Sequence, residues 1–341
     1  MARKPSNRSR IEQLVDEWEP VIQAAFLDAV LDIVSRAELN RIVERLERGD
    51  ISGAIDAVHL DPEAFRTLDT AIAQAFNAGG SSAIGALPTL RDPNGGVFVV
   101  RWDARNVRAE NWLRQHSSNL ITRITDDQRA AVRSALEQAM IAGRNPRSAA
   151  LDLVGRVNRV TGKRQGGLIG LTRPQTAAVE NARSALLSGD TSAMRGYLAL
   201  TRRDKRFDPT VIKAINEGRS VPSDMVARIT GRYADGLLAL RGETIARTET
   251  MAALNQPGIE AMQQAIDAGA VKAETVTKTW HTARDPRVRD SHAAIDRQVV
   301  GINGVFSNGL SYPGDPAGGA AEVANCRCWM ETKIDFFAGL T

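Results

Sequence analysis

The chain has 341 residues, of which 43% are hydrophobic, 25% are charged and 5% are aromatic. This mixture is typical of a globular protein of two or three domains, and it excludes wholesale disorder, collagen-like repeats and a disulfide-stapled miniprotein. Because aromatic residues are scarce, the core must be built from Ala, Leu, Ile and Val, which favours helices over β-sandwiches.

The net charge of +4 is small, but the charges are unevenly distributed. Residues 258–341 contain 8 basic and 10 acidic residues, whereas residues 144–173 contain seven basic residues and Asp152 as their single acidic one. A polyanion is therefore a candidate partner of the segment 144–173.

The sequence gives no sign of a membrane segment. No apolar stretch approaches the ~18–20 residues needed to cross a bilayer, and the basic N-terminus lacks the hydrophobic run of a signal peptide. The two cysteines, Cys326 and Cys328, stand one residue apart. A bond between them would close a very tight ring, so we interpret them as reduced thiols or metal ligands in a cytosolic protein.

The first part of the chain predicts helices. Residues 1–10 carry four basic residues and no acidic one, which indicates a flexible basic arm. Apolar residues recur every three or four positions from Ile11 onward, and residues 39–48 and 62–77 predict two further helices. The Gly- and Pro-containing segment 79–96 breaks the pattern and marks a candidate sub-boundary.

Capping signals place the later helices. Thr125 with Gln128, and Thr172 with Gln175, form capping-box patterns that predict two helix starts. A helix over residues 208–218 follows, and then a long one from Pro222 to about Leu254. The segment 161–170 is rich in Gly and basic residues, and we expect an exposed loop there.

The character of the sequence changes after Pro257. A short helix over residues 259–268 leads to a strand at 274–281, a turn-rich stretch and a last strand at 328–334. The predicted fold class is therefore a mainly α N-terminal region, residues 11–256, followed by a small α+β C-terminal module, residues 257–341.

Two of the four histidines and both cysteines fall in this module. His281, His292, Cys326 and Cys328 offer the imidazole and thiolate ligands that a tetrahedral Zn²⁺ takes. The Cys-x-Cys spacing is tighter than the usual one, so a strand would have to aim both thiols together. The alternative is that these side chains are buried and hydrogen-bonded, and organise a small, turn-rich module without metal.

A catalytic interpretation uses neighbouring residues. Asp285, Arg289 and His292 would share one site if a helix began at Asp285, with Pro286 in its first turn. Together with the two cysteines they would suit a metal-dependent hydrolase or nuclease. Helix capping by Asp285 requires no such chemistry, and we expect no enzymatic activity and no catalytic residue.

A set of C-terminal residues carries a family resemblance through its order and spacing: Trp280, Asp285, Arg287, Val288, Arg289, His292, Phe306, Tyr312, Pro313, Gly314, Asp315, Asn325, Cys326, Arg327 and Cys328. This set resembles the head-morphogenesis domain of tailed bacteriophages, the family of phage Mu F-like minor head proteins. Residues 245–250 resemble the helix that leads into that domain. The sequence departs from the family at Arg297, which follows Asp296 where the family often has glycine.

The resemblance implies a structural minor head protein of a phage or prophage. Such proteins are present in few copies, associate with the portal protein and with capsid or scaffold proteins, and accompany packaged DNA. The implied location is the virion, in the head interior or at the portal vertex, and the host cytoplasm during assembly. We expect no cofactor, and Zn²⁺ at the C-terminal histidines and cysteines is the alternative.

The basic loops of the helical region suit sequence-independent contacts with the phosphates of double-stranded DNA. They are equally compatible with solvated helix faces, and a free-standing nucleic-acid-binding protein is a third interpretation. The candidate DNA-binding residues are Arg144, Arg147, Arg156, Arg159, Lys163, Arg164 and Arg173, followed by Arg202, Arg203, Lys205 and Arg206.

Overall fold

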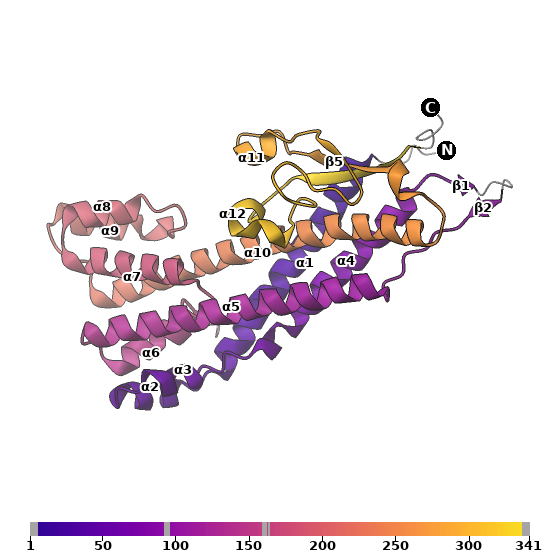
Figure 1. Cartoon of the computed structure of the whole chain (residues 1–341). Helices are drawn as coiled ribbons and strands as arrows, with labels where there is room; N and C mark the ends of the chain where they lie inside the picture. The colour runs from indigo at the N-terminus through magenta and orange to yellow at the C-terminus, as the bar shows by residue number, and fades with distance from the viewer. Residues whose placement is uncertain (1–5, 92–95, 159–161, 163, 336–341) are drawn as a thin grey trace. The chain divides into compact units, whose positions relative to one another are not determined.

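The computed structural model describes residues 6–91, 96–158, 162 and 164–335 (Figure 1). Helices dominate the chain and a small three-stranded sheet lies near its C-terminal end, which confirms the predicted fold class. The chain divides into two compact units. Unit 1 comprises Met1–Phe26, Thr67–Ser118 and Glu243–Thr341, and unit 2 comprises Leu27–Arg66 and Asn119–Gly242. Among the described residues, no helix has the length and apolarity to span a membrane.

Unit 2 is built from helices around an aliphatic core. Its complete helices are α2 (Leu39–Glu47), α3 (Ile51–Asp56), α6 (Pro146–Val154), α7 (Arg173–Ser188), α8 (Thr191–Leu198) and α9 (Asp208–Asn216), with 3₁₀ helices at Pro62–Phe65 and Lys205–Phe207. It also contains the later part of α1 (Asn7–Arg36), the later part of α5 (Val107–Ile141) and the earlier part of α10 (Ser223–Asp267). Ile42, Leu136 and Leu186 are among its buried residues, as the scarcity of aromatics predicted.

The start of α7 confirms one of the two capping boxes. The Thr172 hydroxyl accepts a hydrogen bond from the Gln175 backbone, and the Gln175 side chain accepts one from the Thr172 backbone N–H. The helix ends at Gly189, whose φ of 73° lies in the left-handed region that glycine adopts without strain.

The predicted exposed loop at residues 161–170 is wrong in its second half. Strands β3 (Arg156–Val157) and β4 (Arg164–Gln165) pair as a short antiparallel hairpin. The chain then enters the core of unit 2, where Leu168 and Ile169 are buried. The glycine-rich composition predicted an exposed loop, but the apolar side chains of Leu168 and Ile169 bury the second half of this segment. Residues 159–161 and 163 lie outside the described residues.

Two predicted helix limits are also wrong. Helix α4 (Arg66–Ala86) continues through Gly79, so the predicted break begins later, at the short hairpin of β1 (Leu90–Arg91) and β2 (Val97–Phe98). Thr125 starts no helix, because it lies inside α5, where its hydroxyl donates to the Ile121 carbonyl at 2.9 Å. A local capping pattern does not interrupt a helix when the residues before and after the pattern are both packed against the core.

The long helix α10 passes through Pro257 and ends at Asp267, so the predicted helix end near Leu254 is wrong. Proline removes the hydrogen bond that the Ala253 carbonyl would otherwise receive. The backbone of Gly79 in α4 lies against this turn, close to Pro257 and to the Ala253 carbonyl. Packing within unit 1 therefore keeps the helix continuous where the sequence indicated a break.

The start of α1 shortens the predicted basic arm. The helix begins at Asn7, so residues 7–10 belong to it, and the Asn7 side chain donates to Glu331 at 3.1 Å. Residues 1–5 lie outside the described residues.

The C-terminal sheet of unit 1 is antiparallel in the order β6-β5-β7, with β5 (Val276–His281) between β6 (Val299–Gly301) and β7 (Trp329–Ile334). The short helices α11 (Asp290–Ala293) and α12 (Gly319–Val323) and 3₁₀ turns at Ala273–Thr275 and Pro316–Gly318 lie around the strands. The sheet lies beside the later part of α10 (Figure 1), where the Asn255 side chain accepts from the Met330 backbone at 3.0 Å. The two strands predicted from alternation are both present.

Candidate functional site

The core of the C-terminal module is formed by the inward face of β5. Its alternation places Val276, Lys278 and Trp280 on one face, and all three are buried. The Trp280 ring packs edge-on against the rings of His292, at 5.0 Å between centroids, and Phe306, at 5.2 Å. This aromatic cluster surrounds the two cysteines and fixes the position of His292.

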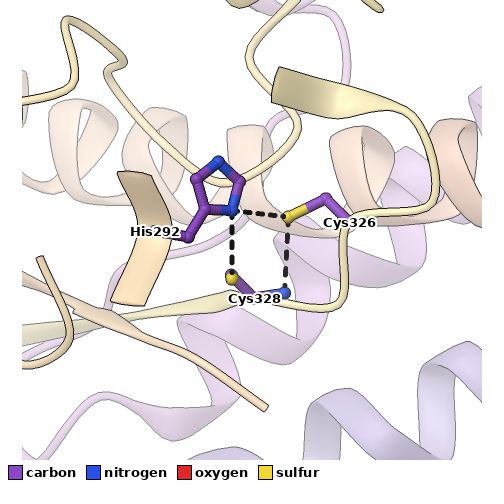
Figure 2. Close-up of side chains that lie close together, drawn as sticks. All are labelled: His292, Cys326 and Cys328. Carbon is purple, nitrogen blue, oxygen red and sulfur yellow. Dashed lines mark hydrogen bonds between the residues drawn. The ribbon is translucent and has the colours of Figure 1, made fainter. Parts of the chain in front are cut away.

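His292, Cys326 and Cys328 converge in this core (Figure 2). The His292 Nδ1 atom lies 3.6 Å from the Cys326 Sγ atom and 3.4 Å from the Cys328 Sγ atom. Each of the three residues is at most 2% exposed. His292 comes from α11, and the cysteines come from the segment that leads into β7, so the cluster joins two parts of the module that are more than 30 residues apart.

The other side of the His292 ring is also held in place. Its Nε2 atom lies 2.8 Å from the Glu322 carboxylate of α12, which also accepts a hydrogen bond from the Ser291 hydroxyl at 3.0 Å. The imidazole is therefore oriented by a carboxylate on one side while its Nδ1 atom faces both sulfurs. This is the arrangement in which a carboxylate fixes the tautomer and the direction of a ligating histidine.

The two thiols differ in proton affinity. The Cys328 thiol donates to the Cys326 sulfur, and together with the nearby His292 this lowers the Cys326 pKa to about 5. The Cys328 pKa is raised, because that proton is held by Cys326 and a second negative charge would be buried beside the first. Of the two thiols, Cys326 therefore loses its proton more readily than Cys328 does.

His281 does not join this cluster, which corrects the four-residue set predicted from the sequence. It follows Trp280 on β5 and therefore points to the opposite face of the sheet. There its ring stacks on Trp329 at 4.2 Å between centroids, and its Nε2 atom lies 3.5 Å from the Glu331 carboxylate. Its pKa is lowered by burial. Among the described residues, the one group of this kind with metal-ligand geometry is His292, Cys326 and Cys328.

Asp285 and Arg289 have structural contacts, and the helix predicted to begin at Asp285 is absent from this described stretch, because α11 starts at Asp290. The Asp285 carboxylate accepts from the Arg287 backbone N–H at 2.9 Å and from the Arg327 guanidinium through two bonds. Arg327 holds the pKa of Asp285 at about 2. Arg289 donates to the Ala324 carbonyl. These contacts fasten the turn at 285–289 to the segment 324–327.

The closing motif of the module is fastened to α10. Asn325 adopts a φ of 55°, its backbone N–H donates to the Thr248 hydroxyl at 3.0 Å, and its side-chain amide approaches the Thr244 hydroxyl. Gly314, with a φ of 89°, lies so close to α10 that a Cβ atom there would be 3.0 Å from the Ala252 nitrogen. The motif residues thus join the module to the helix that precedes it.

Pro313 and Asp315 complete this attachment. The Pro313 carbonyl accepts from the Asn255 side chain of α10 at 3.1 Å. Asp315 accepts from the backbone N–H groups of Ser311 and Ala317, and so fixes the turn that precedes α12.

Sequence reasoning missed three buried polar residues, Lys278, His116 and Glu249. Lys278 lies on the apolar face of β5. Side chains alternate between the two faces of a strand, so the sequence pattern that predicts a buried Trp280 also predicts that Lys278 lies on the same face. The His116 Nε2 atom lies 2.5 Å from the Glu249 carboxylate of α10, and its ring stacks on Trp112 at 4.4 Å between centroids. Nothing in the sequence pointed to the contacts of His116, because its partner lies 133 positions further along the chain.

Several predicted DNA-binding residues are engaged in ion pairs within unit 2. Arg144 and Arg156 both pair with the buried carboxylate of Asp152, and Arg203 pairs with Asp208 at 2.9 Å. Arg206 likewise pairs with Asp204, and Arg164 donates to the Gly155 carbonyl. Arg202 is half-buried.

Apart from Arg206, which is exposed but pairs with Asp204, three of the candidates have exposed side chains: Arg147, Arg173 and Lys205. Arg159 and Lys163 lie outside the described residues. The exposed three are therefore the members of the predicted set best placed to meet a partner.

The C-terminal geometry defines a class of protein before any comparison. The protein is mainly helical and has a small α+β module. The motif residues of this module make contacts within it or fasten it to α10. Residues 205–331 match the family described as Phage Mu protein F like protein. This match confirms, for residues 205–331, the resemblance to the Mu F-like family of phage head-morphogenesis proteins. No curated protein and no solved structure matches the chain.

Proposed function

We propose that the protein is a minor head protein that associates with the portal and the head interior during assembly and contacts packaged DNA. The observation that carries this proposal is the match of residues 205–331 to the Mu F-like family, over a region that contains α10 and most of the C-terminal module. Portal, capsid or scaffold proteins and double-stranded DNA are the proposed partners.

The contacts of the motif residues favour a structural role over a catalytic one. Asp285, Arg289 and Asn325 are used in ion pairs and hydrogen bonds within the module or to α10. The cavity lined by His292, the two cysteines, Arg289 and Asn325 has a volume of about 10 Å³. A volume of that order holds about one water molecule, and no substrate of a hydrolase or nuclease fits it.

The charge of unit 2 supports the DNA contact. In unit 2, residues 119–242 contain 21 basic and 11 acidic residues and residues 27–66 contain 5 and 9, so the unit has a net charge of +6, whereas residues 258–341 have a small acidic excess. Such a basic excess attracts a polyphosphate without reading its sequence. We therefore assign the DNA contact to unit 2 and assembly contacts to the Mu F-like region.

The test is the composition of purified heads. The tagged full-length chain is expressed with its neighbouring portal and capsid proteins, and the heads are analysed by quantitative mass spectrometry. We expect a few copies per head, and loss of those copies when the portal protein is omitted.

A matched pair of variants connects this result to the module. Asp285→Asn removes the charge that holds Arg327, whereas Asp290→Asn makes the same change at an exposed position of α11. We expect the first variant to enter heads less often than the second. Absence of the wild-type chain from heads, or retention that does not depend on the portal, would contradict the proposal.

A further inference from the structure

The cluster of His292, Cys326 and Cys328 has the dimensions of one face of a metal-centred tetrahedron. Zn–N bonds of about 2.0 Å and Zn–S bonds of about 2.3 Å, at the tetrahedral angle, separate a nitrogen from a sulfur by about 3.5 Å. The His292 Nδ1 atom lies 3.6 Å and 3.4 Å from the two sulfurs. All three ligand atoms lie within 4.8 Å of one another.

Hydrogen bonds to the His292 Nδ1 atom alone do not account for this convergence. The Nδ1 atom of an imidazole offers one proton or one lone pair, and here two sulfur atoms share it (Figure 2). A hydrogen bond therefore satisfies one sulfur and leaves the other at the same short distance without a proton to share with that nitrogen. A single cation in contact with all three atoms satisfies the whole group.

The surroundings of the cluster are those of a prepared metal site. Glu322 lies 2.8 Å from the opposite nitrogen of His292 and directs the Nδ1 lone pair toward the sulfurs. The Cys328 backbone N–H lies 3.5 Å from the Cys326 sulfur, in position to stabilise negative charge on it. Two thiolates balance the charge of a divalent cation, so the occupied site would bury no net charge.

We propose that His292, Cys326 and Cys328 bind one Zn²⁺ ion that has a structural role in the C-terminal module. The fourth ligand is a water molecule, because the adjoining cavity of about 10 Å³ has room for one. The ion joins α11 to the segment that leads into β7, and so closes the module around Trp280. This role goes beyond the proposed function in assembly and does not depend on it.

Cobalt(II) is the probe for the site, because tetrahedral Co²⁺ with thiolate ligands has characteristic charge-transfer and d–d absorption bands. The reduced full-length chain is stripped with a chelator and titrated with Co²⁺ and then with Zn²⁺. We expect the tetrahedral bands to saturate at one Co²⁺ per chain and to disappear when Zn²⁺ displaces it. The melting temperature should rise with Zn²⁺ and fall when a chelator removes it. This wild-type experiment does not depend on the folding of any variant.

Variants then test the ligand set. Cys326→Ser, Cys328→Ser and His292→Gln should each abolish the wild-type spectrum, and Glu322→Gln should weaken Zn²⁺ affinity about 10- to 100-fold. The matched control is His281→Gln, on the opposite face of the sheet, which should bind as the wild type does.

Three results would overturn the proposal. The first is that Co²⁺ in the presence of the wild-type chain has the spectrum of the free hydrated ion. The second is that the tetrahedral bands persist in a cysteine variant. The third is that Zn²⁺ binds without changing the melting temperature, which would exclude a structural role.

Discussion

At the scale of single residues, Arg297 adopts a backbone conformation that glycine adopts more readily. Its φ is 69°, in the left-handed region, and its backbone N–H donates to the Trp280 carbonyl at 2.7 Å, shortly before β6 begins. The side chain is exposed. The turn requires a positive φ, which glycine adopts at no steric cost.

We expect Arg297→Gly to stabilise the protein by roughly 0.5–1 kcal/mol, because it relieves the cost of a side chain in the left-handed region. Arg297→Ala is the control, since it removes the same side chain but keeps the Cβ atom. Urea unfolding of the two variants measures the difference. A stability of the glycine variant equal to that of the alanine variant would show that the backbone carries no strain here.

Lys278 is a second residue in an unfavourable environment, because its charged ammonium group is buried. It is 1% exposed, its ammonium lies 5.6 Å from the centroid of the Phe306 ring, and burial lowers its pKa to about 8. Asp315 partly offsets this effect. The folded protein thus releases the Lys278 proton at a lower pH than the unfolded chain does.

Between about pH 8 and pH 10.5 the unfolded chain holds more protons at this position, so stability should rise with pH across that range. Lys278→Met should remove this dependence and stabilise the protein at pH 7 by roughly 2 kcal/mol. Urea unfolding at pH 7 and pH 10 measures both effects. The exposed Lys333 of β7 supplies the control, since Lys333→Met should change stability by less than about 0.5 kcal/mol. An equal effect of the two substitutions would refute this account of Lys278.

At the scale of elements, packing decides where helices end. Local signals at Thr125, Gly79 and Pro257 each indicated a helix boundary, and α5, α4 and α10 continue through all three. The prediction from the capping box at Thr172 is confirmed, because the buried, non-helical segment that contains Leu168 and Ile169 ends there and α7 begins. A local signal marks a helix end when the apolar periodicity also changes at that position.

The contact between α4 and α10 gives a matched pair of substitutions. A Cβ atom at Gly79 would lie 2.9 Å from Pro257 and 3.0 Å from the Ala253 carbonyl, whereas Gly85 of the same helix has open space within 4 Å of its Cβ position. Gly79→Ala should destabilise the protein by about 1–3 kcal/mol. Gly85→Ala should stabilise it by about 0.5–1 kcal/mol through helix propensity.

Thermal unfolding of the two alanine variants checks this pair, because the chemical change is the same in both. A similar effect of both substitutions would mean that α4 and α10 do not approach each other at Gly79 as closely as the structure has them.

At the scale of the whole molecule, charge is divided between the segments. The basic excess lies within residues 119–242, which belong to unit 2, and residues 258–341, which belong to unit 1, are slightly acidic. The ion pairs of Arg144, Arg156 and Arg203 reduce the number of cations that are free to meet a phosphate. The exposed candidates therefore carry most of the expected affinity for DNA.

The double variant Arg147→Glu/Arg173→Glu should weaken binding to a double-stranded DNA fragment. It should also reduce the salt dependence of binding, by about 0.9 in the log–log slope for each phosphate that the protein no longer neutralises. Fluorescence anisotropy over a range of salt concentrations measures both effects. The control is Arg101→Glu/Arg105→Glu, which makes the same charge change at exposed positions of unit 1. Equal effects of the two double variants would assign the binding to net charge alone and contradict a site in unit 2.

The sequence by itself determined the composition of the core, the mainly α fold class, the two long C-terminal strands and the resemblance to the Mu F-like family. These properties depend on periodicity and on motif residues such as Trp280 and Asn325, whose order along the chain is visible without a structure. The basic character of residues 144–173 was equally plain.

Only the tertiary structure decided which side chains meet. It brought Cys326 and Cys328 to His292, turned His281 to the opposite face of β5, and paired His116 with Glu249. It also carried α10 through Pro257. The physical reason is common to these cases. Each depends on contacts between segments far apart in the chain, and the free energy of packing such segments outweighs the local preferences that a sequence pattern records.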